Sequence, residues 1–316
     1  MTESLRLLLE HSLDFAGLFP PAALPVGQAA PAFAADRTGG DGWMLARFVC
    51  PAAKLTELAA FLAAEAAPAA PLPVSALGRN GKTTGEFLAG LDADLSALTA
   101  FRSRVGDRAG VSSVELRLPG EAVAPAVLLK LLGTIEALLA RVPDNGLQPF
   151  FELAPTPTLP AQLAILAEHN AATPARQARP AGFKLRTGGT DAATFPTADQ
   201  FAAALIAARE AGLPMKCTGG LHHALPHRSA SLGVRMHGFV NVLAAATLAH
   251  AGADAATVGA LLGEDQAAAF AFEATGLTWR GHRADLAALC AARRNFLVAF
   301  GCCYLDRPRA GLRASG

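Results

Sequence analysis

Short apolar runs alternate along this chain with longer alanine- and leucine-rich stretches that have helical spacing. The apolar runs predict eight strands, at residues 13–18, 42–50, 72–78, 111–118, 149–153, 182–189, 215–220 and 269–273. The longer stretches predict helices at residues 4–11, 52–67, 84–105, 125–139, 159–170, 198–211, 236–250, 256–262 and 285–296. Strands that are each followed by helical sequence are typical of a parallel sheet covered by helices.

The length of the chain favours closure of this sheet. Its 316 residues suffice for an eight-stranded α/β barrel, so we expect a single (β/α)8 TIM-type barrel over residues 1–316, preceded by a short N-terminal helix. An open doubly wound sheet is the alternative, since no sequence pattern reports closure directly. The Pro- and Ala-rich residues 22–35 are predicted to form a loop.

Two of the predicted strands carry a lysine directly before a glycine pair. Lys184 precedes Gly188 and Gly189, and Lys216 precedes Gly219 and Gly220. Burying an ammonium group costs several kcal/mol unless the group is paired or used. Two lysines at equivalent positions of successive strands therefore indicate a site at one end of the sheet.

Alternation of side chains along strands adds further charges to this end of the sheet. Residues two apart share a face, so Lys184 lies with Arg186, and Glu115 with Arg117, while Glu152 ends its own strand. Barrel enzymes work at the C-terminal ends of their strands, where these residues lie. The alternative is a buried structural layer of ion pairs that neutralise one another.

The residues 184–188 (Lys-Leu-Arg-Thr-Gly) and 216–220 (Lys-Cys-Thr-Gly-Gly) resemble the deoxyribose-phosphate aldolase family. In that family a Lys-x-x-Thr-Gly strand supplies the lysine that forms a Schiff base, and a Lys-x-x-Gly-Gly strand supplies a second lysine. The resemblance implies that Lys184 is the nucleophile and Lys216 its activator. A neighbouring cation and partial burial lower the pKa of a lysine, which frees its amine for attack on a carbonyl.

The chain departs from the family pattern in two places. Residues 74–77 offer no acid for proton relay, so Glu115 or Glu152 must replace it, and residues 221–227 replace a glycine loop that binds phosphate. The backbone N–H groups of the two glycine pairs still suit an anion. The stretch from Lys184 to Asn241 also resembles an uncharacterised bacterial family of barrel proteins.

Several further polar residues are candidates for binding the substrate. Arg186 is the expected anion anchor, and Asp14 is a candidate partner for a substrate hydroxyl or for Lys216, or else a structural cap. Arg47 either binds an anion or pairs with Asp14 or Glu115. The predicted substrate-binding residues are Asp14, Arg47, Glu115, Arg186, Thr187, Gly188, Gly189, Gly219 and Gly220.

Four of the eight histidines lie between residues 222 and 237. His222, His223, His227 and His237 are therefore the ligand set of an alternative function, a metal-dependent hydrolase or isomerase. A histidine here also suits proton transfer, because its pKa is near neutrality.

Composition excludes some classes of partner. The net charge is +1 without a basic block, so no nucleic-acid partner is expected, and no apolar run is long enough for a membrane span. The five cysteines show no disulfide or zinc spacing, and the N-terminus lacks a secretory signal, so we expect a cytoplasmic protein. Homo-oligomerisation stays open.

These observations predict a lysine-dependent lyase or aldolase that acts on a small, anionic carbonyl compound. Lys184 is the predicted nucleophile, Lys216 its activator, and Glu152 or His222 the proton carrier. No cofactor is expected, unless the histidines hold a divalent metal. A third hypothesis is a non-catalytic barrel that binds a small anion.

Overall fold

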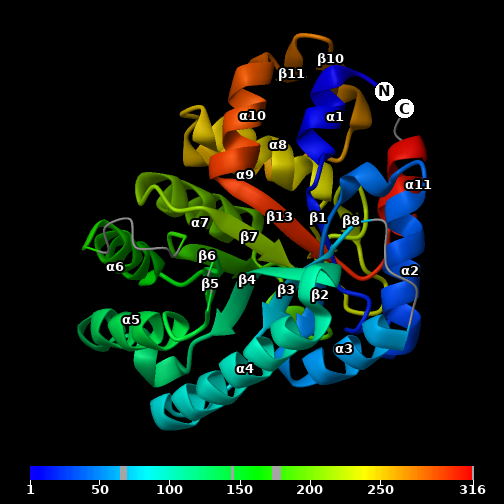
Figure 1. Cartoon of the computed structure of the whole chain (residues 1–316). Coiled ribbons are helices and arrows are strands. Elements are labelled where there is room, and N and C mark those ends of the chain that lie inside the picture. Colours follow the sequence, from blue (N-terminus) through cyan, green and yellow to red (C-terminus); the bar gives the residue numbers. More distant parts are fainter. Residues whose placement is uncertain (65–69, 144–145, 173–178, 315–316) are drawn as a thin grey trace.

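Eight parallel strands close into a barrel at the centre of the molecule (Figure 1). The computed structural model describes residues 1–64, 70–143, 146–172 and 179–314. The barrel strands are β1 (Leu13–Phe15), β2 (Leu45–Pro51), β3 (Leu72–Leu77), β4 (Ala109–Arg117), β5 (Gln148–Leu153), β6 (Gly182–Arg186), β7 (Met215–Thr218) and β13 (Leu297–Cys302). Their order around the barrel is β1-β13-β7-β6-β5-β4-β3-β2, and all neighbours are parallel.

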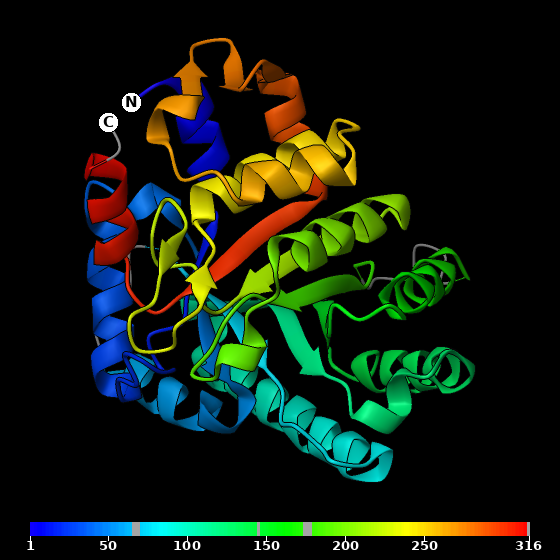
Figure 2. The same ribbon diagram turned by 180° about the vertical axis from the view of Figure 1, so that it is seen from behind.

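Helices surround the strands on the outside of the barrel (Figures 1 and 2). They are α1 (Glu3–Leu9), α2 (Val26–Thr38), α3 (Leu55–Ala64), α4 (Thr84–Val105), α5 (Pro125–Leu139), α6 (Leu159–Ala172), α7 (Ala198–Glu210), α8 (Phe239–His250), α9 (Ala255–Leu262), α10 (Leu286–Asn295) and α11 (Asp306–Ala314). A closed parallel barrel inside a layer of helices is the (β/α)8, TIM-type architecture, which confirms the predicted fold class. None of the helices in the described ranges is long and apolar enough to cross a membrane.

The barrel strands bury both of their faces, and this explains their near-continuous apolar sequences. On β6, Phe183 and Leu185 are fully buried, and between them Lys184 is only 3% exposed. Because neighbouring side chains on a strand point to opposite faces, Lys184 lies on the other face from the two apolar residues. The same alternation places Lys216 between Met215 and Cys217 on β7.

The predicted eighth barrel strand is wrong. Residues 269–273 overlap β10 (Phe270–Glu273), which pairs antiparallel with β11 (Gly276–Trp279), and β11 pairs antiparallel with β12 (His282–Asp285). The strand that closes the barrel is β13, directly after the helix at which the predicted pattern ended. Exposure alternates along β10, whereas β13 is buried along most of its length, as a barrel strand must be.

The predicted loop at residues 22–35 is also wrong, because most of it belongs to α2. This helix contains Pro31 and many alanines, so its amphipathic pattern is weak. Its anchor is Phe33, whose ring lies 5.6 Å from the ring of Phe15 on β1 and 5.6 Å from that of Phe48 on β2. Burial of this aromatic residue at the barrel wall holds the helix in place.

Most other predicted elements agree with the structure apart from their ends. The first predicted strand stops at Phe15, and residues 42–44 form a 3-10 turn before β2. The helices predicted at residues 84–105 and 125–139 have these same bounds in α4 and α5. The helix predicted at residues 52–67 is α3, and residues 65–67 of that prediction lie outside the described residues.

Candidate functional site

Five buried charged side chains meet inside the barrel toward the C-terminal ends of its strands. They are Asp14 on β1, Glu115 on β4, Glu152 on β5, Lys184 on β6 and Lys216 on β7, each at most 9% exposed. The strand register explains part of this meeting, because Glu152 is paired with Lys184 and Lys184 with Lys216. The structure therefore brings together both predicted lysines and the predicted carboxylates.

Glu115 lies between the two lysines and contacts both. Its Oε2 is 2.8 Å from Nζ of Lys184, and its Oε1 is 2.6 Å from Nζ of Lys216. The hydroxyl of Ser75 on β3 donates to the same Oε1 at 2.7 Å. Burial alone would raise the pKa of Glu115, but the two ammonium groups hold it well below its usual value. The carboxylate is therefore ionised and acts as a shared counterion.

The ammonium group of Lys216 has three oxygen neighbours. It contacts Asp14 and Glu115, each at 2.6 Å, and donates to Ser75 Oγ at 3.3 Å. Glu115 and Ser75 accept hydrogen bonds from this ammonium group, and Asp14 is its second charge partner. Nζ also lies 5.2 Å from the centre of the Phe150 ring, whose face attracts a cation. Two carboxylates and an aromatic face therefore surround the Lys216 side chain.

Lys184 has fewer neighbours than Lys216. Within the described chain, its ammonium group contacts the carboxylates of Glu115 at 2.8 Å and Glu152 at 3.2 Å. One N–H bond is left over, and Lys184 lines the cavity above the barrel. Burial alone would lower the pKa of Lys184, but Glu115 and Glu152 raise it above its ordinary value. The prediction that Lys184 has a lowered pKa is therefore wrong for the resting site.

Arg186 forms a salt bridge with Glu152 through two hydrogen bonds. Its Nε and Nη2 donate to the two carboxylate oxygens of Glu152 at 2.9 and 3.3 Å. Arg117 lies 4.0 Å from the same carboxylate, but its side chain is 60% exposed and it is not among the residues that line the cavity. Burial would raise the pKa of Glu152, but Lys184 and Arg186 lower it.

Asp14 contacts both Lys216 of the site and Arg47 on a neighbouring strand. Arg47 on β2 lies 3.3 Å from Asp14 Oδ1 and donates to the Ser112 hydroxyl at 3.1 Å. Two predicted contacts, Asp14 with Lys216 and Arg47 with Asp14, are confirmed. The guanidinium of Arg47 has these partners, and Arg47 is not among the residues that line the cavity.

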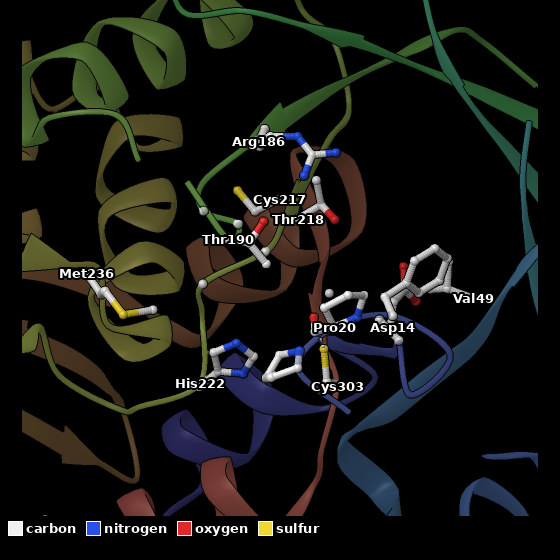
Figure 3. A pocket seen from close by; sticks show the side chains of 18 of the residues that line it. Asp14, Pro20, Val49, Arg186, Thr190, Cys217, Thr218, His222, Met236 and Cys303 are labelled. Carbon is white, nitrogen blue, oxygen red and sulfur yellow. Dashed lines mark hydrogen bonds between the residues drawn. The ribbon is translucent and has the colours of Figure 1, made fainter. Parts of the chain in front are cut away.

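A cavity of about 640 Å³ opens above the lysines (Figure 3). Its floor contains Asp14, Glu115, Lys184 and Lys216, and its walls come from the loops that follow β1, β6 and β7. Arg186 and His222 lie on different sides of the opening in Figure 3. The predicted residues that line the cavity are Asp14, Glu115, Lys184, Arg186, Gly188, Gly189, Lys216, Gly219, Gly220, His222, His223 and His227.

The glycine pairs let two loops approach closely at the cavity wall. Gly219 and Gly220 have φ angles of +81° and +78°, which side chains rarely allow. A Cβ at Gly219 would also collide with the carbonyl oxygen of Gly188. Thr187 belongs to the same packing, since its hydroxyl donates to the Gly219 carbonyl at 2.6 Å. That hydroxyl is therefore not free for a substrate, contrary to the prediction.

The four histidines do not form one cluster. His222 Nδ1 lies 3.3 Å from Cys302 Sγ, and the rings of His223 and His227 lie 3.9 Å apart. His237 bonds to the Pro196 carbonyl at 2.8 Å, away from the cavity lining. In the described part of the chain, no three His, Cys, Asp or Glu side chains are arranged to hold a metal ion. The geometry thus gives the metal-enzyme hypothesis no ligand set.

His222 is the buried histidine of the cavity wall. Burial, together with the positive charge of Arg307, lowers its pKa to about 4, so its imidazole is neutral at pH 7. Burial raises the pKa of the neighbouring Cys302 thiol to about 12, so this cysteine is not a thiolate. The pair is therefore neutral, and His222 can accept a proton.

Sequence reasoning missed three residues of this site. Ser75 and Phe150 contact Lys216, and Arg307 at the start of α11 lines the cavity. The alternation along the third strand could have shown that Ser75 faces inward, since Val74 and Ala76 flank it. No local pattern marks Arg307, because its position depends on the strand β13, which was not predicted.

No protein-family model matches the chain, and no curated protein matches it either. The fold and the site therefore define the protein as a TIM-type barrel with a buried site of paired lysines and carboxylates at its C-terminal end.

Proposed function

We propose that this barrel is a Schiff-base lyase, an aldolase-like enzyme that makes or breaks a carbon–carbon bond next to a carbonyl group. One observation carries the proposal: at the floor of the cavity Lys184 has two oxygen neighbours, the carboxylates of Glu115 and Glu152, while Lys216 beside it has three. The first lysine is thus accessible to a carbonyl carbon, and the second is a fixed positive charge.

The reaction begins with loss of a proton from the Lys184 ammonium group. Glu152, at 3.2 Å, is the carboxylate in contact with Lys184 that does not also contact Lys216, so we assign it as the proton acceptor. The free amine attacks the substrate carbonyl, and loss of water leaves an iminium ion at Nζ. The proton held by Glu152 leaves with this water. Cleavage of the adjacent carbon–carbon bond then moves its electron pair to the iminium nitrogen and gives an enamine, while the hydroxyl group on the departing carbon loses its proton and becomes the carbonyl of the released fragment.

The enamine carbon then takes a proton, and water hydrolyses the resulting imine, which frees the product and restores Lys184. His222 faces the cavity and is neutral at pH 7, so we assign it to take the hydroxyl proton during cleavage and return it to the enamine carbon. Throughout, Lys216 keeps its contacts with Glu115 and Asp14. Its positive charge compensates these carboxylates and limits their hold on the proton of Lys184.

The test is to trap the iminium ion with borohydride and weigh the intact protein. The chain has five lysines, so peptide mapping can assign the adduct without any substitution. We expect the adduct to form much faster on Lys184 than on the exposed Lys82, which is the internal control. Absence of an adduct from folded protein, with a broad set of aldehydes and ketones, would contradict the proposal.

Substitutions provide a second, independent measurement. Lys184→Met should abolish trapping, and Lys216→Met should slow it but leave the adduct on Lys184. Each substitution leaves buried carboxylates without a partner, which costs about 3–5 kcal/mol of stability, so folding must be checked by circular dichroism. An adduct that persists in folded Lys184→Met would rule out this lysine as the nucleophile.

A second function is a non-catalytic barrel that binds a small anion. It is favoured by the complete pairing of both lysines with carboxylates, as in a structural ion-pair layer. Binding of anions without any trapped adduct would support this second function over the first.

A further inference from the structure

The cavity above Lys184 is larger than a two- or three-carbon carbonyl compound requires. Its volume of about 640 Å³ lies within the range of sites for much larger ligands, roughly 300–1,000 Å³. If Lys184 holds the carbonyl carbon at the floor, most of the cavity is left for the rest of the substrate. The residues that line the remaining space therefore indicate which chemical groups the rest of the substrate contains.

Part of the cavity lining is apolar and comes from two loops. Phe19, Pro20 and Pro21, from the loop after β1, form one side. Leu232 and Met236 form the other, and Met236 belongs to the small hairpin of β8 (His227–Arg228) and β9 (Arg235–Met236). Figure 3 shows Pro20 and Met236 well apart across the cavity. A hydrocarbon segment fits between these walls, because it loses no hydrogen bonds on leaving water.

Arg307 is an exposed cation of the cavity lining, whereas Lys184 on the floor is only 3% exposed. Arg307 lines the cavity, and no carboxylate of the described residues lies within ion-pairing distance of its guanidinium. It is placed by α11 and stacks over the Tyr304 ring at 5.0 Å. Arg186, the other arginine of the lining, is by contrast neutralised by Glu152.

Hydrogen-bonding groups accompany Arg307 along the same wall. The hydroxyls of Ser229 and Ser231 lie 3.2 Å apart and line the cavity, as do His223 and His227. Nδ1 of His227 is buried and has no hydrogen-bond partner in the described chain. Burial and the charge of Arg307 lower the pKa of His223, which shows that the guanidinium acts on this wall.

We propose that Arg307 binds an anionic group, a carboxylate or a phosphate, at the end of the substrate distant from Lys184. The proposal rests on the function proposed above and names its substrate class: an amphiphilic acid with a carbonyl, an apolar middle and an anionic head. It assigns the anion to Arg307 instead of Arg186, the anchor predicted from the sequence. Guanidinium suits this role, since its planar fork matches both carboxylate and phosphate oxygens.

The first experiment measures anion binding without any carbonyl chemistry. Isothermal titration calorimetry compares 4-methylbenzoate, phenyl phosphate and the neutral 4-methylbenzyl alcohol on wild type, Arg307→Gln and Arg307→Lys. Arg228→Gln is the matched control, because Arg228 is an exposed arginine of the β8 hairpin outside the lining. We expect Arg307→Gln to weaken anion binding at least about tenfold, as loss of a charged hydrogen bond does.

Binding of the alcohol should not change, and Arg307→Lys should keep part of the anion affinity. The ratio of the benzoate and phenyl phosphate affinities identifies the head group. Equal anion affinity in wild type and folded Arg307→Gln would overturn the proposal, and so would failure of both anions to bind the wild-type protein.

The second experiment separates this proposal from the proposed function. Borohydride trapping compares 4-formylbenzoate with benzaldehyde, and we expect faster trapping of the anionic aldehyde in wild type but not in Arg307→Gln. Trapping on Lys184 without this difference supports the lyase and overturns the anion site. Anion binding that depends on Arg307, without any adduct, supports the anion site while the lyase function fails.

Discussion

Glu152 controls how readily Lys184 becomes a nucleophile, and the substitution Glu152→Gln tests this control. At an ordinary lysine pKa of about 10.4, roughly one amine in 2,500 is free at pH 7, and the raised pKa of Lys184 makes this fraction smaller. An opposite charge within about 4–6 Å shifts a pKa by about 1–3 units, and Glu152 lies 3.2 Å from Nζ. Its removal should therefore increase the free amine about tenfold to a thousandfold.

Arg186 adds to this effect. Once it loses the Glu152 carboxylate, its uncompensated charge repels the ammonium form of Lys184 and lowers the pKa of this lysine further. The substitution thus has two opposite effects on the reaction. It makes the amine of Lys184 easier to deprotonate, but it also removes the assigned proton acceptor. Adduct formation should become faster in Glu152→Gln even if complete turnover becomes slower.

The assay is the initial rate of borohydride trapping between pH 6.5 and pH 9, followed by intact mass. Because the pKa of Lys184 is raised, the wild-type rate should increase about tenfold per pH unit across this whole range. The rate profile of Glu152→Gln should lie at lower pH. Glu168→Gln, at an exposed position on α6, is the control and should match wild type. Equal or slower trapping at pH 7 in folded Glu152→Gln would refute the reasoning.

Three further predictions concern stability, each measured by urea unfolding. Glu115→Gln should cost about 3–5 kcal/mol, because both lysines lose a shared counterion, and a cost below about 1 kcal/mol would contradict the ion-pair network. Gly219→Ala should cost about 1–3 kcal/mol because of the positive φ and the close carbonyl, whereas Gly85→Ala, in open helix surface, should not destabilise. The folded-state pKa of His222 is depressed to about 4, so the unfolded chain binds the proton more strongly, and stability should fall by about 3 kcal/mol from pH 6.5 to pH 4. His222→Gln should remove most of this pH dependence of stability. An unchanged pH dependence in the variant would contradict the assignment to His222.

The sequence predicts much of the charged site, because strand alternation is a local rule. Lys184 and Lys216 occupy equivalent positions on strands that were correctly located, so their meeting follows from the parallel register. Glu115 and Glu152 follow for the same reason. The ion-pair partners cannot be predicted in this way. Alternation does not reveal that Arg186 pairs with Glu152, because this contact depends on how far the side chains reach across strands.

The wrong predictions have physical causes. The β10 segment has the alternation of a strand, and nothing local shows that it pairs with β11 rather than with the barrel. Helix α2 is held by the contacts of Phe33 with two barrel strands, which its own sequence does not display. The positions of β13 and α11 follow from barrel closure, so Arg307 was not accessible to sequence reasoning.

The contact between β1 and β13 has a consequence for the order in which the molecule folds. Leu13 is paired with Phe300, so this contact closes a chain segment roughly nine times longer than the one between Lys184 and Lys216, at about 2 kcal/mol of additional loop entropy. The ion pair between Asp14 and Lys216 spans this same seam, because β13 lies between their strands. Folding intermediates with an open seam would therefore lack the complete charged site, and recovery of anion binding during refolding should coincide with barrel closure rather than with helix formation.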